Sequence, residues 1–229
     1  GHMKGRNLEV VLANPLLQTD GTPKILASTE RVQIKTKARP APGSPNLILP
    51  DDTVAGISLP EPGEETSPRT GVEAGYAAVA KTFPNQVFVV SCDLDPSTKL
   101  GKARSFLSAD HQFEMSIEEQ ASALMANGLA VSSKEPQLNI FSTFAAFFEG
   151  IAREGLEMWR YQRNLTGSNE GLNVTMHLSH VGACTGRDHF SGWSLDWINL
   201  AIGYLPYLDR FYAPADSGSA FLAVKNLAA

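Results

Sequence analysis

The first 68 residues of this 229-residue chain contain no Phe, Tyr or Trp, although they hold nine of its fourteen prolines. A segment so rich in proline and without aromatic side chains cannot build a dense core of its own. We therefore expect residues 4–68 to form an extended arm or linker, after a tag remnant at residues 1–3. Its short apolar runs, 8–12 and 47–49, are expected to add edge strands or to dock on a neighbouring surface.

The sequence also has few cysteines, no long apolar run and no basic cluster, and each absence excludes a class of protein. The two cysteines, Cys92 and Cys184, are too few for a disulfide framework and are not spaced like metal ligands, so we interpret both as reduced thiols. The sequence has no run of about 18 apolar residues that could span a membrane. It also has no cluster of Lys and Arg to offset its net charge of -5. We expect a cytoplasmic protein that binds neither nucleic acid nor a membrane surface.

From residue 69 onward, apolar runs alternate with helical patterns, which is typical of βα units around a mainly parallel sheet. The pattern predicts one α/β domain over residues 69–229, with a three-layer α/β/α arrangement. The expected strands are 87–92, 138–141, 174–178 and 210–212, and the expected helices are 71–82, 117–131, 145–161, 194–204 and a last one from 216. Right-handed crossovers place the carboxyl ends of the strands at one edge, where such folds bind ligands.

Polar and aromatic residues collect after these strands. Asp93, Asp95 and Ser97 follow the first, and Thr143, Phe144 and Phe147 follow the second. Ser179, His180 and residues 182–189, which include Asp188, follow the third. The two phenylalanines are either core residues or a stacking wall for a flat heterocycle. His180 is either a loop histidine with a local partner or a functional residue of a glycine-rich loop. His177, on an expected strand, is interpreted as a buried histidine with a hydrogen-bond partner. No HExxH or CxxC spacing indicates a metal site, and no GxSxG elbow indicates a hydrolase.

Glu119 allows two interpretations. With Ser116 it forms an S-x-x-E pattern, which is typical of a capping box that satisfies the first backbone N–H groups of a helix. The alternative is a carboxylate at a helix N-terminus, in surroundings rich in Ala, Leu and Met, that exchanges a proton with a ligand nitrogen.

The order of these motifs resembles the pyrimidine-binding domain of transketolases, over about residues 69–229. The resemblance rests on Ser-Ile-Glu-Glu-Gln-Ala at 116–121, Asn-Gly-Leu-Ala at 127–130, Ser-Thr-Phe-Ala-Ala-Phe at 142–147, Ser-His at 179–180 with Gly-Arg-Asp at 186–188, and Tyr-Ala-Pro-Ala-Asp at 212–216. It implies an enzyme that uses thiamine diphosphate and Mg²⁺ to transfer a two-carbon ketol unit between sugar phosphates. A homodimer is also implied, because the family binds its cofactor between two subunits.

The resemblance also implies roles for single residues. Glu119 would bond the pyrimidine nitrogen and favour the imino tautomer of the ring, so that the exocyclic nitrogen can remove the thiazolium proton. Phe144 and Phe147 would line the pyrimidine pocket, and Asp93 would lie beside the thiazolium. The sugar contacts would be His180 and Asp188, with His180 also catalytic, and the sugar phosphate would contact Ser97 and Arg69.

Departures from the family pattern affect the substrate more than the cofactor. The usual second histidine of the long loop is replaced by Gly192, and a third aromatic residue of the pyrimidine pocket by Gly150. A phosphoketolase-like enzyme, a 2-oxoacid dehydrogenase E1-like enzyme and a catalytically silent dimerisation or docking domain are therefore retained as alternatives.

The chain has no Gly-Asp-Gly motif followed by Asn to hold Mg²⁺ and the diphosphate. We expect another domain or chain to supply that half of the site. We also expect the chain to be an excised domain without its last strand, or a subunit of a split enzyme.

Overall fold

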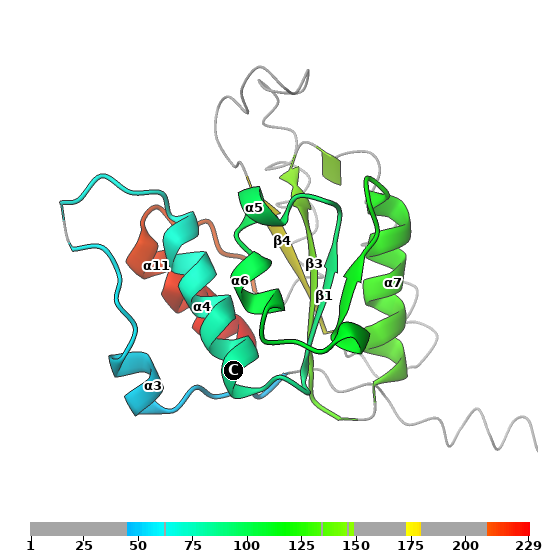
Figure 1. Cartoon of the computed structure of the whole chain (residues 1–229), viewed down its shortest axis with the longest axis horizontal. Helices are drawn as coiled ribbons and strands as arrows, with labels where there is room; N and C mark the ends of the chain where they lie inside the picture. The colour runs from blue at the N-terminus through cyan, green and yellow to red at the C-terminus, as the bar shows by residue number, and fades with distance from the viewer. Residues whose placement is uncertain (1–44, 62, 134, 146, 149–172, 180–209) are drawn as a thin grey trace, which may run out of the picture. The chain divides into compact units, whose positions relative to one another are not determined.

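The computed structural model describes residues 45–61, 63–133, 135–145, 147–148, 173–179 and 210–229 (Figure 1). These residues belong to a compact unit that begins at Pro40. The strands described are β1 (Val87–Ser91), β2 (Gln112–Glu114), β3 (Leu138–Phe144) and β4 (Val174–Ser179). They form one parallel sheet in the order β2-β1-β3-β4, which confirms the α/β class and the parallel arrangement predicted from the sequence.

The helices of the described segments surround this sheet. They are α3 (Asp51–Ala55), α4 (Arg69–Thr82), α5 (Asp95–Thr98), α6 (Gly101–Arg104), η1 (Ala109–His111), α7 (Glu119–Ser132) and α11 (Ser217–Ala228). Within these segments, none of the helices is long and apolar enough to cross a membrane.

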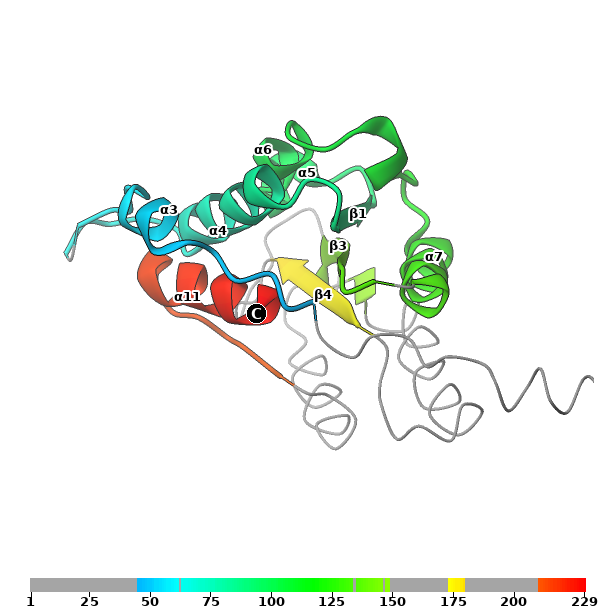
Figure 2. The same ribbon diagram turned by 90° about the horizontal axis from the view of Figure 1, so that it is seen from below.

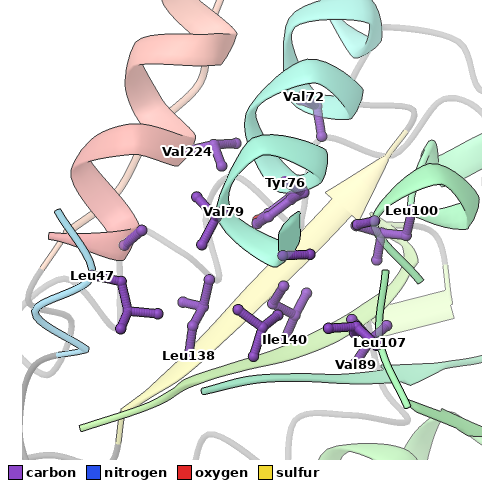
Figure 3. Packing of buried hydrophobic residues seen from close by; sticks show 14 of the residues in the cluster. Leu47, Val72, Tyr76, Val79, Val89, Leu100, Leu107, Leu138, Ile140 and Val224 are labelled. Atoms are coloured by element: carbon purple, nitrogen blue, oxygen red, sulfur yellow. The ribbon is translucent and has the colours of Figure 1, made fainter. Parts of the chain in front are cut away.

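Alternation along the strands distributes apolar side chains to both faces of the sheet. On one face, Val89 and Ile140 cluster with residues of α4 and α11, including Tyr76 and Val224 (Figure 3). On the other face, Val90, Phe141 and Val174 cluster with the alanines of α7. The two ribbon views agree with this division, with α7 on one side of the strands and α4, α6 and α11 on the other (Figures 1 and 2).

The arm contributes to the core where it is described. Leu47 and Leu49 are each 2% exposed and belong to the cluster under α4, whereas Ile48 between them points outward and is 64% exposed. The backbone N–H of Leu47 donates to the Ala228 carbonyl oxygen at 2.6 Å, so this run is attached to the end of α11. The apolar run 47–49 therefore docks on a neighbouring surface, one of the two outcomes expected from its sequence, and forms no strand.

Helices α4 and α11 approach so closely that two positions on α4 admit only glycine. A Cβ atom at Gly71 would lie 1.8 Å from the Ser217 carbonyl oxygen, and one at Gly75 would lie 2.8 Å from the Val224 Cβ. Ser217 also donates its hydroxyl to the Ser67 carbonyl oxygen at 3.1 Å, which joins the starts of the two helices. The start of α11 is itself capped by Asp216, whose Oδ1 accepts the Ser219 N–H at 2.7 Å.

One of the predicted strands does not form. Residues Arg210–Tyr212 are described and are not part of the sheet, and the side chains of Phe211 and Tyr212 are 44% and 39% exposed. Aromatic residues favour strands only where a neighbouring strand and a covered face are present, and Pro214, two residues on, has no N–H to offer a partner. The short edge strand β2 was not expected, because its three residues include a single apolar side chain, Phe113.

We predict that Gly71→Ala destabilises the fold by roughly 1–3 kcal/mol, because the new methyl group overlaps the backbone of α11 and the two helices must separate. Gly128→Ala is the matched control: Gly128 lies in α7 with open space around it, so alanine should stabilise the helix by up to about 1 kcal/mol. Urea unfolding of the two variants measures both effects, and equal stabilities would contradict the packing described.

Candidate functional site

The carboxyl ends of β1, β3 and β4 lie at one edge of the sheet, since the strands are parallel and in register. Asp93 lies two residues after the end of β1, and Phe144 is the last residue of β3. Helix α7 packs against β1, β3 and β4 and begins at Glu119, whose hydroxyl partner Thr143 is the penultimate residue of β3. Three of the predicted cofactor contacts, Asp93, Glu119 and Phe144, are therefore at this edge, as the sequence predicts.

Glu119 is a buried carboxylate at the first position of α7. Its side chain is 2% exposed, and its Oε1 accepts a hydrogen bond from Thr143 Oγ1 at 3.1 Å. Within the described residues no donor lies on Oε2. The partial positive charge at a helix N-terminus favours a carboxylate at this position.

The capping box expected from Ser116 and Glu119 does not form. The N-cap of α7 is Glu118 and makes no side-chain cap. The Ser116 backbone N–H donates instead to Glu114 Oε1 at 3.3 Å, and the Ser116 φ of 57° turns the chain away from the box geometry. Of the two interpretations of Glu119, local capping is therefore wrong.

The phenylalanines after β3 separate into two groups. Phe148 is a core residue that lies against Phe141 under α7, with ring centroids 6.4 Å apart. Phe144 and Phe147 stack on each other, with centroids 5.8 Å apart and ring planes at 21°. Phe144 is 6% exposed and Phe147 is half-buried, so Phe147 is the more accessible ring of this stacked pair.

Asp93 is held in a left-handed conformation, with φ at 58°. Its backbone N–H donates to Glu114 Oε1 at 2.7 Å, which links the loop after β1 to the end of β2. The Asp93 side chain is exposed.

A network of charges around Arg104 supports this loop. Arg104 Nη1 pairs with Asp95 Oδ2 and with Glu114 Oε2, the latter at 2.8 Å. Asp95 Oδ1 accepts the Ser91 hydroxyl at 2.5 Å, so the network reaches the end of β1. Burial alone would lower the pKa of Arg104, but its hydrogen bonds to Glu114 and Asp95 outweigh that effect and raise it.

Arg69 and Ser97, the two predicted phosphate contacts, meet in the structure although 28 residues separate them. Arg69 Nη1 donates to the Ser97 carbonyl oxygen at 2.8 Å, and its Nε donates to Ser67 Oγ at 3.2 Å. The arginine lies at the start of α4 and the serine lies in α5. The contact uses the backbone oxygen of Ser97, so it fixes the Arg69 guanidinium beside α5.

Beside α5, a row of polar side chains crosses the sheet through the paired residues Ser91, Ser142 and His177. His177 Nε2 donates to the Thr98 carbonyl oxygen at 3.0 Å, and Tyr76 meets its ring edge-on at 5.4 Å. This confirms the expected hydrogen-bond partner of His177, although its side chain is half-buried and not fully buried. The hydroxyls of Thr98 and Ser142 are buried and have no hydrogen-bond partner among the residues that the structure describes.

The remaining predicted site residues, His180 and Asp188, lie outside the described residues, as do Cys184, Gly150 and Gly192. Sequence reasoning missed Glu114, Arg104 and the contact of Thr143 with Glu119. The sequence does place Thr143 at this edge, after the expected strand 138–141, but gives no signal for its partner. Glu114 and Arg104 carry no comparable signal.

The described part of the chain contains no group of three or more His, Cys, Asp or Glu side chains that could hold a metal ion. Cys92 is free and buried, and its thiol donates to Ser122 Oγ at 3.3 Å. Burial raises the pKa of the Cys92 thiol to about 11, and the charges of Glu119 and Glu114 add to this effect. Cys92 is therefore a protonated, unreactive thiol near neutral pH.

Comparison with known proteins provides no family assignment: no protein-family model matches the chain, and no curated protein matches it.

We predict that His177 makes the fold less stable in mild acid. Burial lowers the pKa of His177 from 6.5 to about 4. Between these pH values the unfolded chain takes up a proton that the folded chain refuses, so stability falls as the pH falls, by up to about 3 kcal/mol in total. Urea unfolding from pH 7 to pH 4 measures the loss. His177→Gln keeps an N–H donor for Thr98 but does not titrate, so its stability should depend less on pH; equal pH dependence of the two proteins would refute the assignment.

Proposed function

We propose that this chain is the pyrimidine-binding domain of a thiamine-diphosphate-dependent, transketolase-like enzyme, with the three-layer α/β/α fold of that domain. The enzyme transfers a two-carbon ketol unit between sugar phosphates. The all-parallel sheet and the collection of Asp93, Glu119 and Phe144 at its carboxyl edge support the proposal. The motif order along the sequence supplies the family, and the geometry is consistent with it.

The observation that carries the proposal is Glu119. It is a carboxylate at 2% exposure that caps no helix and pairs with no described cation. Burying such a group is unfavourable unless it has partners, and within the described residues Thr143 is the hydrogen-bond partner of one of its oxygens, Oε1. A ligand N–H group at Oε2 would complete its hydrogen bonds, and a ring nitrogen that gains and loses a proton provides one.

The described residues fit the pyrimidine end of the cofactor. Thiamine diphosphate supplies an electron sink for carbanion chemistry when it is bound. Glu119 holds and returns a proton at the pyrimidine ring nitrogen, as a general acid and base must. Phe144 and Phe147 offer the flat wall against which the ring stacks, and Asp93 is exposed at the same edge, where it faces the ligand.

The position of Arg69 supports a sugar-phosphate substrate. The contact of Arg69 with the Ser97 carbonyl oxygen places the guanidinium beside α5. It uses Nη1, and Nε bonds Ser67, whereas Nη2 donates to no described residue. An anionic group such as a sugar phosphate can take up the remaining N–H groups of Arg69. In this proposal His180 and Asp188 contact the sugar, with His180 also taking part in catalysis.

The proposal requires a partner for the other half of the cofactor. The Mg²⁺ and diphosphate ligands come from a diphosphate-binding domain or subunit, and the active form is a cytoplasmic homodimer. The cofactor then lies between two chains, with this domain contributing the pyrimidine site.

We predict that the chain alone binds thiamine diphosphate weakly, whether or not Mg²⁺ is present, because the pyrimidine site by itself offers little contact area. The free aminopyrimidine of the cofactor, 4-amino-5-hydroxymethyl-2-methylpyrimidine, should bind at about millimolar concentration. NMR titration measures both ligands, with Glu119→Ala as the variant that abolishes binding. Tight, Mg²⁺-dependent binding by the chain alone would contradict the division of the site. An aminopyrimidine that does not bind, or that binds equally to Glu119→Ala, would favour a silent docking domain.

In the assembled enzyme, Glu119→Gln should reduce turnover by about 100-fold or more, because an amide cannot exchange a proton with the pyrimidine nitrogen. The fold should be nearly unaffected, within roughly 1 kcal/mol, since the Gln carbonyl oxygen can still accept the Thr143 hydroxyl. Steady-state kinetics at saturating thiamine diphosphate, with urea unfolding of the same samples, measures both quantities. Near-normal turnover by a folded Gln variant would remove the proposed role of Glu119.

A further inference from the structure

Glu114 connects the two loops that lead to the proposed cofactor contacts. Its Oε1 accepts the Asp93 backbone N–H at 2.7 Å and the Ser116 backbone N–H at 3.3 Å. Asp93 belongs to the loop after β1, whereas Ser116 lies three residues before Glu119 in the loop that enters α7. A single carboxylate oxygen thus joins the loop after β1 to the loop before α7. In the sequence, α5, α6, η1 and β2 lie between these two loops.

Both of these N–H groups belong to residues in the left-handed region. The φ angles are 58° at Asp93 and 57° at Ser116, and neither residue is glycine. Such a conformation is unfavourable at a residue with a Cβ and persists where surrounding contacts enforce it. Hydrogen bonds from N–H groups to an ionised carboxylate are strong enough to do so.

The carboxylate is itself fixed from its other side. Arg104 Nη1 donates to Glu114 Oε2 at 2.8 Å, and Arg104 Nε donates to Gln112 Oε1 at 3.1 Å in the same strand, β2. Arg104 also pairs with Asp95, which accepts the Ser91 hydroxyl at the end of β1. Arg104, and through it Glu114, is therefore held by side chains of strands β1 and β2.

We propose that Glu114, held by Arg104, is a positioning residue that fixes Asp93 and Glu119 relative to each other at the ligand edge. This inference rests on the proposed function for what the two residues contact. Its geometric part is that one carboxylate holds Asp93 and Ser116 in the left-handed conformation. This part depends only on the hydrogen bonds described above.

The geometric part is tested by NMR on the chain without ligand. In Glu114→Ala the amide protons of Asp93 and Ser116 should move upfield and exchange with solvent about tenfold faster or more, because both lose a charged acceptor. The Val79 amide, in the core of α4, should not change. Glu65→Ala removes an exposed glutamate of the irregular segment before α4 and serves as the matched control, with no effect on any of the three amides.

The functional part is tested by titrating the same proteins with 4-amino-5-hydroxymethyl-2-methylpyrimidine. Misplaced contact groups weaken binding, so Glu114→Ala should raise the Kd about tenfold or more while Glu65→Ala leaves it unchanged. Glu114→Gln keeps an acceptor oxygen for the two N–H groups, so it should recover most of the amide signals and most of the affinity. It also replaces the alanine variant where that protein does not fold.

The outcomes separate the two proposals. Unchanged Asp93 and Ser116 amides in a folded Glu114→Ala protein would overturn the positioning role. Changed amides with unchanged aminopyrimidine affinity would overturn it as well, since the loops would then move without effect on the site. Absence of Glu119-dependent binding by the unmodified chain would count against the proposed function instead, and the amide signals would then decide by themselves whether Glu114 fixes the loops.

Discussion

The parallel pairing of β1 with β3 determines the position of every other described element. It aligns Val87 with Leu138 and Ser91 with Ser142, so the two central strands begin together and β1 ends beside the polar part of β3. Alternate residues then face α4 and α11 on one side and α7 on the other. Because the strands run in the same direction, the chain must return by a helix each time, and α7 consequently starts at the edge where the strands end.

This constraint explains why the edge is polar and strained while the centre of the sheet is apolar. Beyond Ser91 no further strand pairing supports the backbone, and the chain turns through left-handed residues at Asp93 and Ser116. The carboxylates of Asp95 and Glu114, together with Arg104, replace the ladder hydrogen bonds as the support of this region. Local strain sustained by a polar network is a common property of ligand-binding edges.

Glu119 illustrates how tertiary contacts override a local pattern. S-x-x-E is a sound sequence signature for a capping box, yet Ser116 adopts a φ of 57° and gives its N–H to Glu114. Glu119, at the first position of α7, then makes no capping hydrogen bond and accepts one from Thr143 on β3, 24 residues away. A local motif can be formed only when no distant partner offers its groups a better arrangement, and here the sheet edge offers one.

The sequence alone determined the α/β class, the strands β1, β3 and β4, and the helices α4, α7 and α11, because continuous apolar runs and helical periodicity are properties of neighbouring residues. It also placed Asp93, Glu119 and Phe144 at one edge, since parallel strands leave no other location for the residues that follow them. The contact of Arg69 with Ser97, the network of Arg104 with Glu114, and the docking of Leu47 beside α11 were decided by the tertiary structure. The failure of Arg210–Tyr212 to form a strand has the same origin: pairing depends on which surfaces meet in space, and these residues have no strand beside them among the described segments.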